Sequence, residues 1–175
     1  MSPRPQFHPA QAVEIARAFE QEGVDYLFIG KSAAILLGYP GTTQDMHVFP
    51  ARSAENGRRI VAALRKIGFD VDASLEQQVV AGKDFVQIKT GPFDLDLVFA
   101  PDGISSFDEA KARGIVVEEF RVANLRDIIA SKRASGRQRD MMDLPLLESF
   151  RAEYEKQHPQ ARKSSAELAT EHPAA

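Results

Sequence analysis

The chain contains no cysteine among its 175 residues. This absence excludes disulfide bonds, cysteine-based zinc sites and thiol catalysis, and it is compatible with a reducing cytoplasm. No apolar run approaches the ~20 residues that a membrane-spanning helix needs. The polar start from Met1 to Pro5 does not resemble a signal peptide. We therefore expect a cytoplasmic protein that does not enter a membrane.

The chain also lacks a strong excess of charge of either sign, with 22 basic and 25 acidic residues and a net charge of −3. Such a balance gives no general attraction to nucleic acid, so any RNA contact would depend on local basic clusters. Candidates are Arg58–Arg59, Arg65–Lys66 and the stretch Lys132–Arg139. The composition, 43% hydrophobic and 27% charged, predicts one globular domain over residues 1–156. Residues 157–175 are polar and rich in Ala, Ser and Pro, which predicts a weakly ordered tail.

The hydrophobic pattern predicts an α/β (α+β) fold, with a small mixed sheet flanked by helices and two helices at the C-terminal end. Pro145 is compatible with the last of these helices only in its opening turn or at a kink. Strands are expected over residues 27–29, 45–49, 85–88, 93–99 and 114–122, and helices over 9–22, 32–37, 54–67, after 106, from 124 and from 137.

A glycine turn follows the first expected strand. Residues 27–29 are apolar, and Gly30 allows the backbone to turn sharply and approach a ligand. A helix that begins near Ser32 would direct free N–H groups and a positive dipole end toward this turn. Lys31 would add a positive charge beside it. The pattern is typical of a phosphate-binding turn, although glycine turns are also common wherever strands meet helices.

Two polar groups, Asp45 and His47, alternate with apolar residues along the next expected strand. Because side chains alternate between the faces of a strand, Asp45 and His47 share one face. Carboxylate and imidazole groups both bind divalent metals. The other interpretation is an edge strand whose polar face meets solvent.

Acids also interrupt the apolar segment from Phe93 to Phe99, where Asp94 and Asp96 lie on the face opposite Leu95 and Leu97. Buried carboxylates need a cation or hydrogen-bond donors. They could bind a metal with Asp45 and His47, or pair with Lys89 or another basic residue.

These motifs resemble the MNT-type, AbiEii-like branch of the polymerase β-like nucleotidyltransferase superfamily. Members carry a glycine pair, an apolar helix, a basic-Thr turn and an Asp-x-Asp strand. A second block, which includes Lys132, Arg139, Asp140 and Asp143, resembles the family's C-terminal signature, in which a helix with a lysine precedes an Arg-x-Arg/Lys-Asp-x-x-Asp-Leu run. The resemblance extends from about Val24 to Leu147.

The resemblance implies an Mg²⁺- or Mn²⁺-dependent nucleotidyltransferase that uses a nucleoside triphosphate. It implies catalytic roles for Asp45, Asp96, Lys132 and Asp140, and metal binding by Asp45, His47 and Asp96, with Asp94 as the alternative third carboxylate. The nucleotide would contact the residues Gly30, Lys31, Ser32, Thr43, Lys132 and Arg139. The implied acceptor is a hydroxyl of RNA, such as tRNA, or of a partner protein in a toxin–antitoxin pair.

Three positions depart from the family pattern. Lys31 replaces a second Gly or Ser, Gly41 replaces a basic residue, and His47 replaces the second metal aspartate. Imidazole suits Mn²⁺, Co²⁺, Ni²⁺ or Zn²⁺ better than Mg²⁺. The chain is therefore either an enzyme with an altered metal preference or a catalytically degenerate module that binds a nucleotide or a partner.

Overall fold

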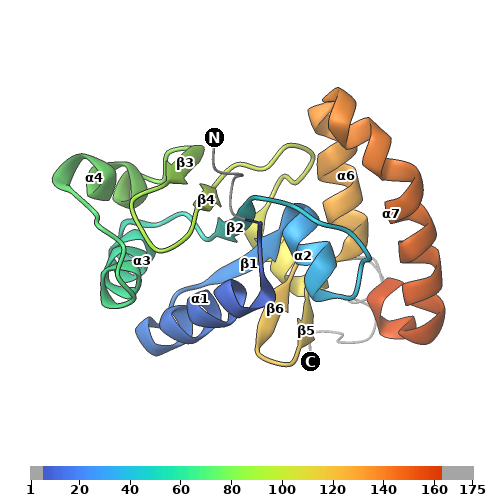
Figure 1. Ribbon diagram of the computed structural model, residues 1–175, viewed down its shortest axis with the longest axis horizontal. Helices are drawn as coiled ribbons and strands as arrows, with labels where there is room; N and C mark the ends of the chain where they lie inside the picture. The colour runs from blue at the N-terminus through green and yellow to red at the C-terminus, as the bar shows by residue number, and fades with distance from the viewer. Residues whose placement is uncertain (1–5, 163–175) are drawn as a thin grey trace, which may run out of the picture.

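The computed structural model describes residues 6–162 and has a six-stranded sheet with helices packed around it (Figure 1). This architecture confirms the predicted α/β fold with C-terminal helices. The elements in chain order are α1 (Pro9–Glu22), β1 (Tyr26–Ile29), α2 (Gly30–Leu36), β2 (Met46–Pro50), α3 (Ala54–Lys66), α4 (Ala73–Ala81), β3 (Phe85–Ile88), β4 (Leu95–Val98), α5 (Phe107–Arg113), β5 (Ile115–Val117), β6 (Phe120–Val122), α6 (Leu125–Ser135), α7 (Gln138–Gln157) and the 3₁₀ helix η1 (Pro159–Arg162).

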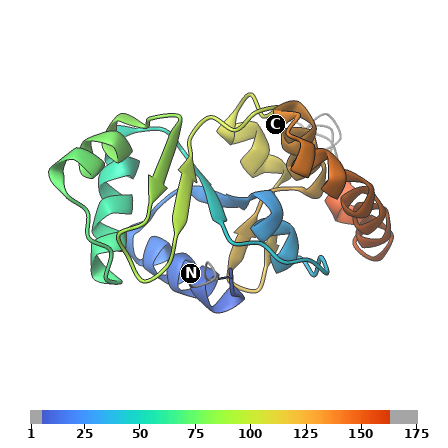
Figure 2. The same ribbon diagram turned by 45° about the horizontal axis from the view of Figure 1, so that its top comes forward.

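The sheet is mixed, with the strand order β3-β4-β2-β1-β6-β5. Strand β2 lies inside the sheet, antiparallel to β1 and parallel to β4. Strand β1 is also parallel to β6, while β3 and β5 form the two edges. In Figures 1 and 2, α3 and α4 lie beside the β3–β4 end of the sheet, and α6 and α7 lie at the opposite end. Any group carried by β2 is therefore held on both sides by backbone hydrogen bonds.

Helix boundaries follow local signals in the sequence. Helix α1 begins with a proline, and Gly23 ends it in the left-handed conformation at φ 70°. Ser53 and Ser106 cap α3 and α5 by accepting hydrogen bonds from Asn56 N–H and Glu109 N–H. Within the described part of the chain, no helix combines the length and apolar character needed to cross a membrane.

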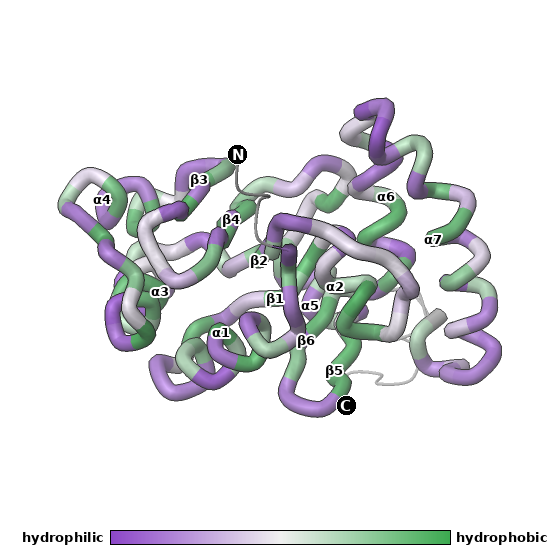
Figure 3. Tube along the Cα trace, viewed as in Figure 1, coloured by the Kyte–Doolittle hydropathy of each residue, from purple (hydrophilic) through white to green (hydrophobic). Residues whose placement is uncertain are grey.

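The core runs through the centre of the molecule between the sheet and its helices. Phe28, Ile15, Leu95 and Ile128 are among its fully buried side chains. Figure 3 shows hydrophobic segments gathered around α2, β6 and α6, whereas hydrophilic segments follow the outer turns.

The structure corrects two local predictions. Residues 114–122 form a hairpin of β5 and β6 rather than one strand. The turn between them places Glu118 at φ 52°, a conformation that the alternation of residue types did not reveal. Helix α4 was not foreseen, because among its residues only Val79 is buried and the apolar stripe is therefore weak.

The C-terminal helix α7 continues through Pro145, seven residues after its start at Gln138, so the proline lies beyond the opening turn. The ordered chain also extends past the predicted boundary at residue 156. Residues 159–162 form η1, and the buried amide of Asn124 donates a hydrogen bond to the Ala161 carbonyl at 2.7 Å. This contact orders the first part of the segment predicted as a tail, and residues 163–175 lie outside the described residues.

Candidate functional site

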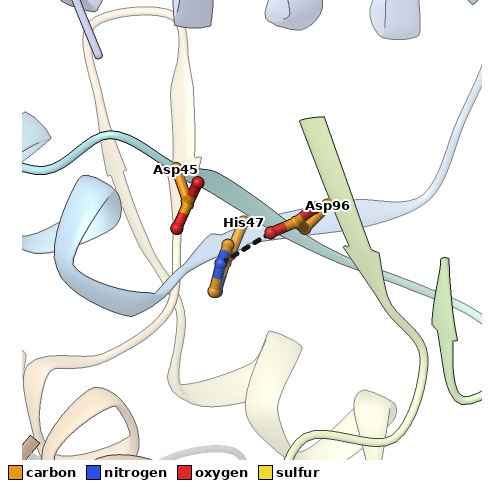
Figure 4. Close-up of side chains that lie close together, drawn as sticks. All are labelled: Asp45, His47 and Asp96. Atoms are coloured by element: carbon orange, nitrogen blue, oxygen red, sulfur yellow. Dashed lines mark ion pairs between the residues drawn. The ribbon is translucent and has the colours of Figure 1, made fainter. Parts of the chain in front are cut away.

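Three potential metal ligands converge at the ends of β2 and β4. Asp45 directly precedes β2, His47 lies on β2, and Asp96 lies on β4 (Figure 4). One ligand atom from each residue lies within 4.8 Å of the other two. His47 Nε2 lies 3.0 Å from Asp96 Oδ2. The face-sharing predicted for Asp45 and His47, and the expected proximity of Asp96, are both present.

Strand pairing fixes this arrangement. In the parallel β2–β4 pair, His47 lies opposite Asp96, and in the antiparallel pair with β1 it lies opposite Ile29. The interpretation of β2 as a solvent-facing edge strand is therefore wrong. Asp94 precedes β4 and is not among the three clustered ligands. Of the two candidate carboxylates, Asp96 is the one that joins the cluster.

Gly30 lies directly against the imidazole of His47. Its φ of +77° is in the left-handed region, and a Cβ placed there would lie 3.3 Å from His47 Nδ1. Glycine thus leaves room for the ring, and it adopts the left-handed backbone conformation without strain. The neighbour observed at this turn is the histidine, and the predicted approach of a ligand stays a prediction.

Ser32 has a different contact from the predicted one. Its hydroxyl is buried, donates to the Ile29 carbonyl at 3.3 Å and accepts from the His47 N–H at 3.3 Å. A hydroxyl with both roles filled and no solvent access is not available to a phosphate. Ser32 therefore connects α2 to β2 and helps to position His47.

The donor set of Asp45, His47 and Asp96 fits a divalent cation. Two carboxylates supply negative charge, and the imidazole supplies a nitrogen that favours Mn²⁺, Co²⁺, Ni²⁺ or Zn²⁺ over Mg²⁺. Asp96 is buried, whereas Asp45 and His47 are partly exposed. An ion arriving from solvent could therefore reach the open side of the cluster.

A second group of charges lies where α6 meets α7. Lys132 Nζ lies 3.2 Å from Asp140 Oδ1, while Ser135 and Arg137 donate to Asp140 Oδ2 at 2.6 and 2.7 Å. Burial by itself raises the pKa of Asp140, but the hydrogen bonds from Ser135 and Arg137 and the charge of Lys132 together lower it to about 2. Because its carboxylate is only 3% exposed, Asp140 holds Lys132 in place and is not accessible as a substrate-contacting group.

Asp143 connects the N-terminal motif around Gly30 with the C-terminal motif around Lys132. Its Oδ1 lies 3.4 Å from Lys31 Nζ on α2, and its Oδ2 lies 3.7 Å from Lys132 Nζ on α6. Lys31 follows Gly30 in the chain, so α2 extends from the His47 ring to this charge cluster. Lys132 is therefore not merely part of a solvated basic helix end.

The remaining predicted contacts differ in their setting. Arg139 is exposed and forms no ion pair with any residue from 6 to 162. Thr43 is partly buried, and its carbonyl accepts a hydrogen bond from Phe7 N–H at 2.8 Å. Neither residue contacts Asp45, His47 or Asp96 through a hydrogen bond or ion pair within residues 6–162, so their predicted nucleotide contacts stay predictions.

Sequence reasoning missed Ser135 and Tyr39. Ser135 lies at the end of α6, and only the fold brings its hydroxyl onto Asp140. Burial, with a further contribution from the negative charge of Asp143, raises the pKa of Tyr39. Its ring edge would lie 2.6 Å from a Cβ on Gly41, so a larger residue at position 41 would require the ring or the loop to shift.

A separate cavity of about 240 Å³ lies between α6 and α7, lined by Arg126, Ile129, Arg133, Glu148 and Arg151. Its charges are paired, since Arg133 and Arg151 bond Glu148, and Arg126 and Arg151 bond Glu155. The hydrogen bond from Arg133 and the charge of Arg151 lower the pKa of Glu148 below its usual value. None of the three candidate metal ligands, Asp45, His47 and Asp96, lines this cavity.

The fold and the site define a mixed α/β protein with a cluster of metal-ligand type on two parallel strands. No family signature matches the chain, and no curated protein matches it. Among solved structures, the chain is similar to the crystal structure of JHP933 from Helicobacter pylori, with a TM-score of 0.50 and 17% identity over 84% of this chain and 67% of that chain. At this level of identity the likeness concerns the fold alone.

Proposed function

We propose that the protein binds a nucleoside triphosphate with a divalent metal and transfers a nucleoside monophosphate to a hydroxyl of RNA, such as tRNA, or of a partner protein in a toxin–antitoxin pair. The proposal also places the protein in the cytoplasm. The observation that carries it is the convergence of Asp45, His47 and Asp96, whose ligand atoms lie within 4.8 Å of one another. The resemblance of the surrounding motifs to the AbiEii-like nucleotidyltransferases supports the same function.

Two further features of the site support this choice. Gly30 lets the turn pack against the His47 ring, and Lys31 and Lys132 place ammonium groups on α2 and α6. A triphosphate needs both a metal and fixed positive charge, because its negative charge is spread over several oxygens. Lys31 and Lys132 are about a hundred residues apart in the chain, and the fold brings both ammonium groups to the carboxylate of Asp143.

In this function, the residues of the chain have separate roles. Asp45, His47 and Asp96 would hold the cation, which when bound polarises the phosphoryl group and offsets its charge. Lys132, held by Asp140, would lie against the phosphates, so Asp140 acts as a positioning residue. Ser32 fixes the backbone of His47.

A second candidate function is a catalytically degenerate module that binds a nucleotide or a partner protein. The observation that favours it is the contact of 3.0 Å between His47 Nε2 and Asp96 Oδ2, in which two of the three ligands satisfy each other. Replacing a carboxylate by imidazole also removes negative charge from the site. Ground-state binding and transition-state stabilisation are separate, so a nucleotide could bind well and react slowly.

Isothermal titration with ATP, CTP, GTP and UTP, each with Mg²⁺ and then with Mn²⁺, tests the proposal. We expect metal-dependent binding that is stronger with Mn²⁺ and lost in Asp45→Ala. Asp94→Ala is the matched control, because this acid directly precedes β4, the strand that carries Asp96, but is not one of the three clustered ligands. Equal loss in both variants, or no binding of any nucleotide under either condition, would contradict the proposed site.

His47→Asp separates the two candidate functions. Incubation with a labelled triphosphate and a tRNA or protein mixture should show transfer by the parent chain with Mn²⁺ if it is an enzyme. If only His47→Asp transfers label, and does so with Mg²⁺, the natural chain is the degenerate module.

A further inference from the structure

The charge cluster at α2, α6 and α7 contains two acids in very different settings. Asp140 is 3% exposed and has three donors, from Lys132, Ser135 and Arg137. Asp143 is 26% exposed, and within residues 6–162 its ion-pair partners are Lys31 at 3.4 Å and Lys132 at 3.7 Å. Charge-assisted hydrogen bonds usually measure roughly 2.7–2.9 Å, so both contacts of Asp143 are long. Asp140 is thus a fixed part of the structure, and Asp143 is loosely held.

The two lysines, in contrast, are brought together by the fold. Lys31 belongs to α2 and Lys132 to α6, and both ammonium groups face the same carboxylate from different elements. An ammonium group can donate three hydrogen bonds. Asp143 is the only acid within ion-pair distance of Lys31 among residues 6–162. This arrangement is that of a two-cation anion site with a carboxylate of the chain itself inside it.

We infer that Asp143 is an internal counter-ion that occupies the place of a polyphosphate tail and is displaced from Lys31 and Lys132 when the tail binds. This inference rests on the proposed nucleotide site and assigns the regulation of its affinity. A polyphosphate has more negative charge and more acceptor oxygens than one carboxylate, so it competes well for both ammonium groups. Asp140 keeps Lys132 in place during the exchange.

The neighbouring residues agree with a replaceable contact. Tyr39 lies close enough for the Asp143 charge to act on its hydroxyl, and Lys31 Cε would lie 3.3 Å from a Cβ on Gly41. The glycine loop therefore leaves the Lys31 side chain room beside it. Removing the Asp143 charge should leave the packing intact, because its carboxylate makes no short hydrogen bond.

Titration with inorganic tripolyphosphate, without metal, tests this inference on the intact chain. Partly exposed ion pairs contribute up to about 1 kcal/mol, so Asp143→Asn should tighten binding roughly two- to fivefold. Lys31→Met should weaken binding, and the loss should be larger in the Asp143→Asn background than in the parent, because the counter-ion no longer masks Lys31. The control is Asp84→Asn, which changes the net charge equally at an exposed ion pair with Arg52.

The outcomes separate the inference from the proposed function. Unchanged or weaker binding by Asp143→Asn, with an unaltered melting temperature, would overturn the inference. Equal tightening by Asp84→Asn would also overturn it, because net charge alone would then explain the gain. If nucleotide binding did not depend on metal and on Asp45, the proposed function would be overturned, even if tripolyphosphate bound as expected.

Discussion

Asp140→Asn should destabilise the protein strongly although the substitution preserves shape. The carboxylate is buried and accepts from Lys132, Ser135 and Arg137. An amide offers one acceptor oxygen and one donor group, so at least one of these donors would face another donor. Lys132, itself only 12% exposed, would lose its closest counter-charge. Removal of one partner from a buried ion pair leaves the other charge uncompensated.

The pKa gives the size of this effect and its dependence on pH. A lowering of the Asp140 pKa from 3.8 to about 2 corresponds to roughly 2 kcal/mol of folded-state stabilisation. Because the folded-state pKa is lower than the unfolded one, this stabilisation is present above pH 3.8 and is lost as the pH falls toward 2. We expect Asp140→Asn to lower the free energy of unfolding by roughly 2–3 kcal/mol at pH 7, and the melting temperature by roughly 4–10 °C.

Urea unfolding of the parent and of Asp140→Asn, followed by circular dichroism at pH 7, 5, 4 and 3, measures this difference. The gap between the two proteins should be constant from pH 7 to 5 and narrow below pH 4. Asp84→Asn, at an exposed ion pair, should change stability by less than about 0.5 kcal/mol at every pH. A gap that stays constant down to pH 3, or a variant as stable as the parent at pH 7, would refute the reasoning.

Two other substitutions test the framework of the site. Gly30→Ala should lower the free energy of unfolding by roughly 1–2 kcal/mol, because φ is +77°, and it should weaken Mn²⁺ binding, because the new methyl group would press on the His47 ring. Thermal melts measure the first effect and metal titration the second. Unchanged Mn²⁺ affinity would contradict the contact. Asn56→Ala should lower the free energy of unfolding by roughly 2–4 kcal/mol, because the buried amide of Asn56 forms hydrogen bonds with the backbone of Asp25 and Ala51. Urea unfolding measures this loss. A loss below about 1 kcal/mol would contradict the expected contribution of these hydrogen bonds.

The sequence indicated which three side chains lie together, partly from local signals and partly from the family resemblance. Alternation of polar and apolar residues placed Asp45 and His47 on one face. The acids in the apolar segment 93–99 left Asp94 and Asp96 both open, and the family resemblance favoured Asp96. The setting of Asp140 could not be predicted, because it depends on Ser135 and Arg137 reaching one carboxylate across the α6–α7 turn. Pairing order was equally hidden, since the inward position of β2 results from strands distant in the chain.

The parallel pairing of β2 with β4 also determines when the cluster can form during folding. Parallel neighbours need a crossover, and here α3, α4 and β3 all lie between the two strands in the chain. The entropy of closing this long connection must be lost before His47 meets Asp96. The ligands are therefore assembled only when the centre of the sheet is complete. A divalent ion that needs the complete cluster cannot nucleate folding, and its binding would report arrival at the native state.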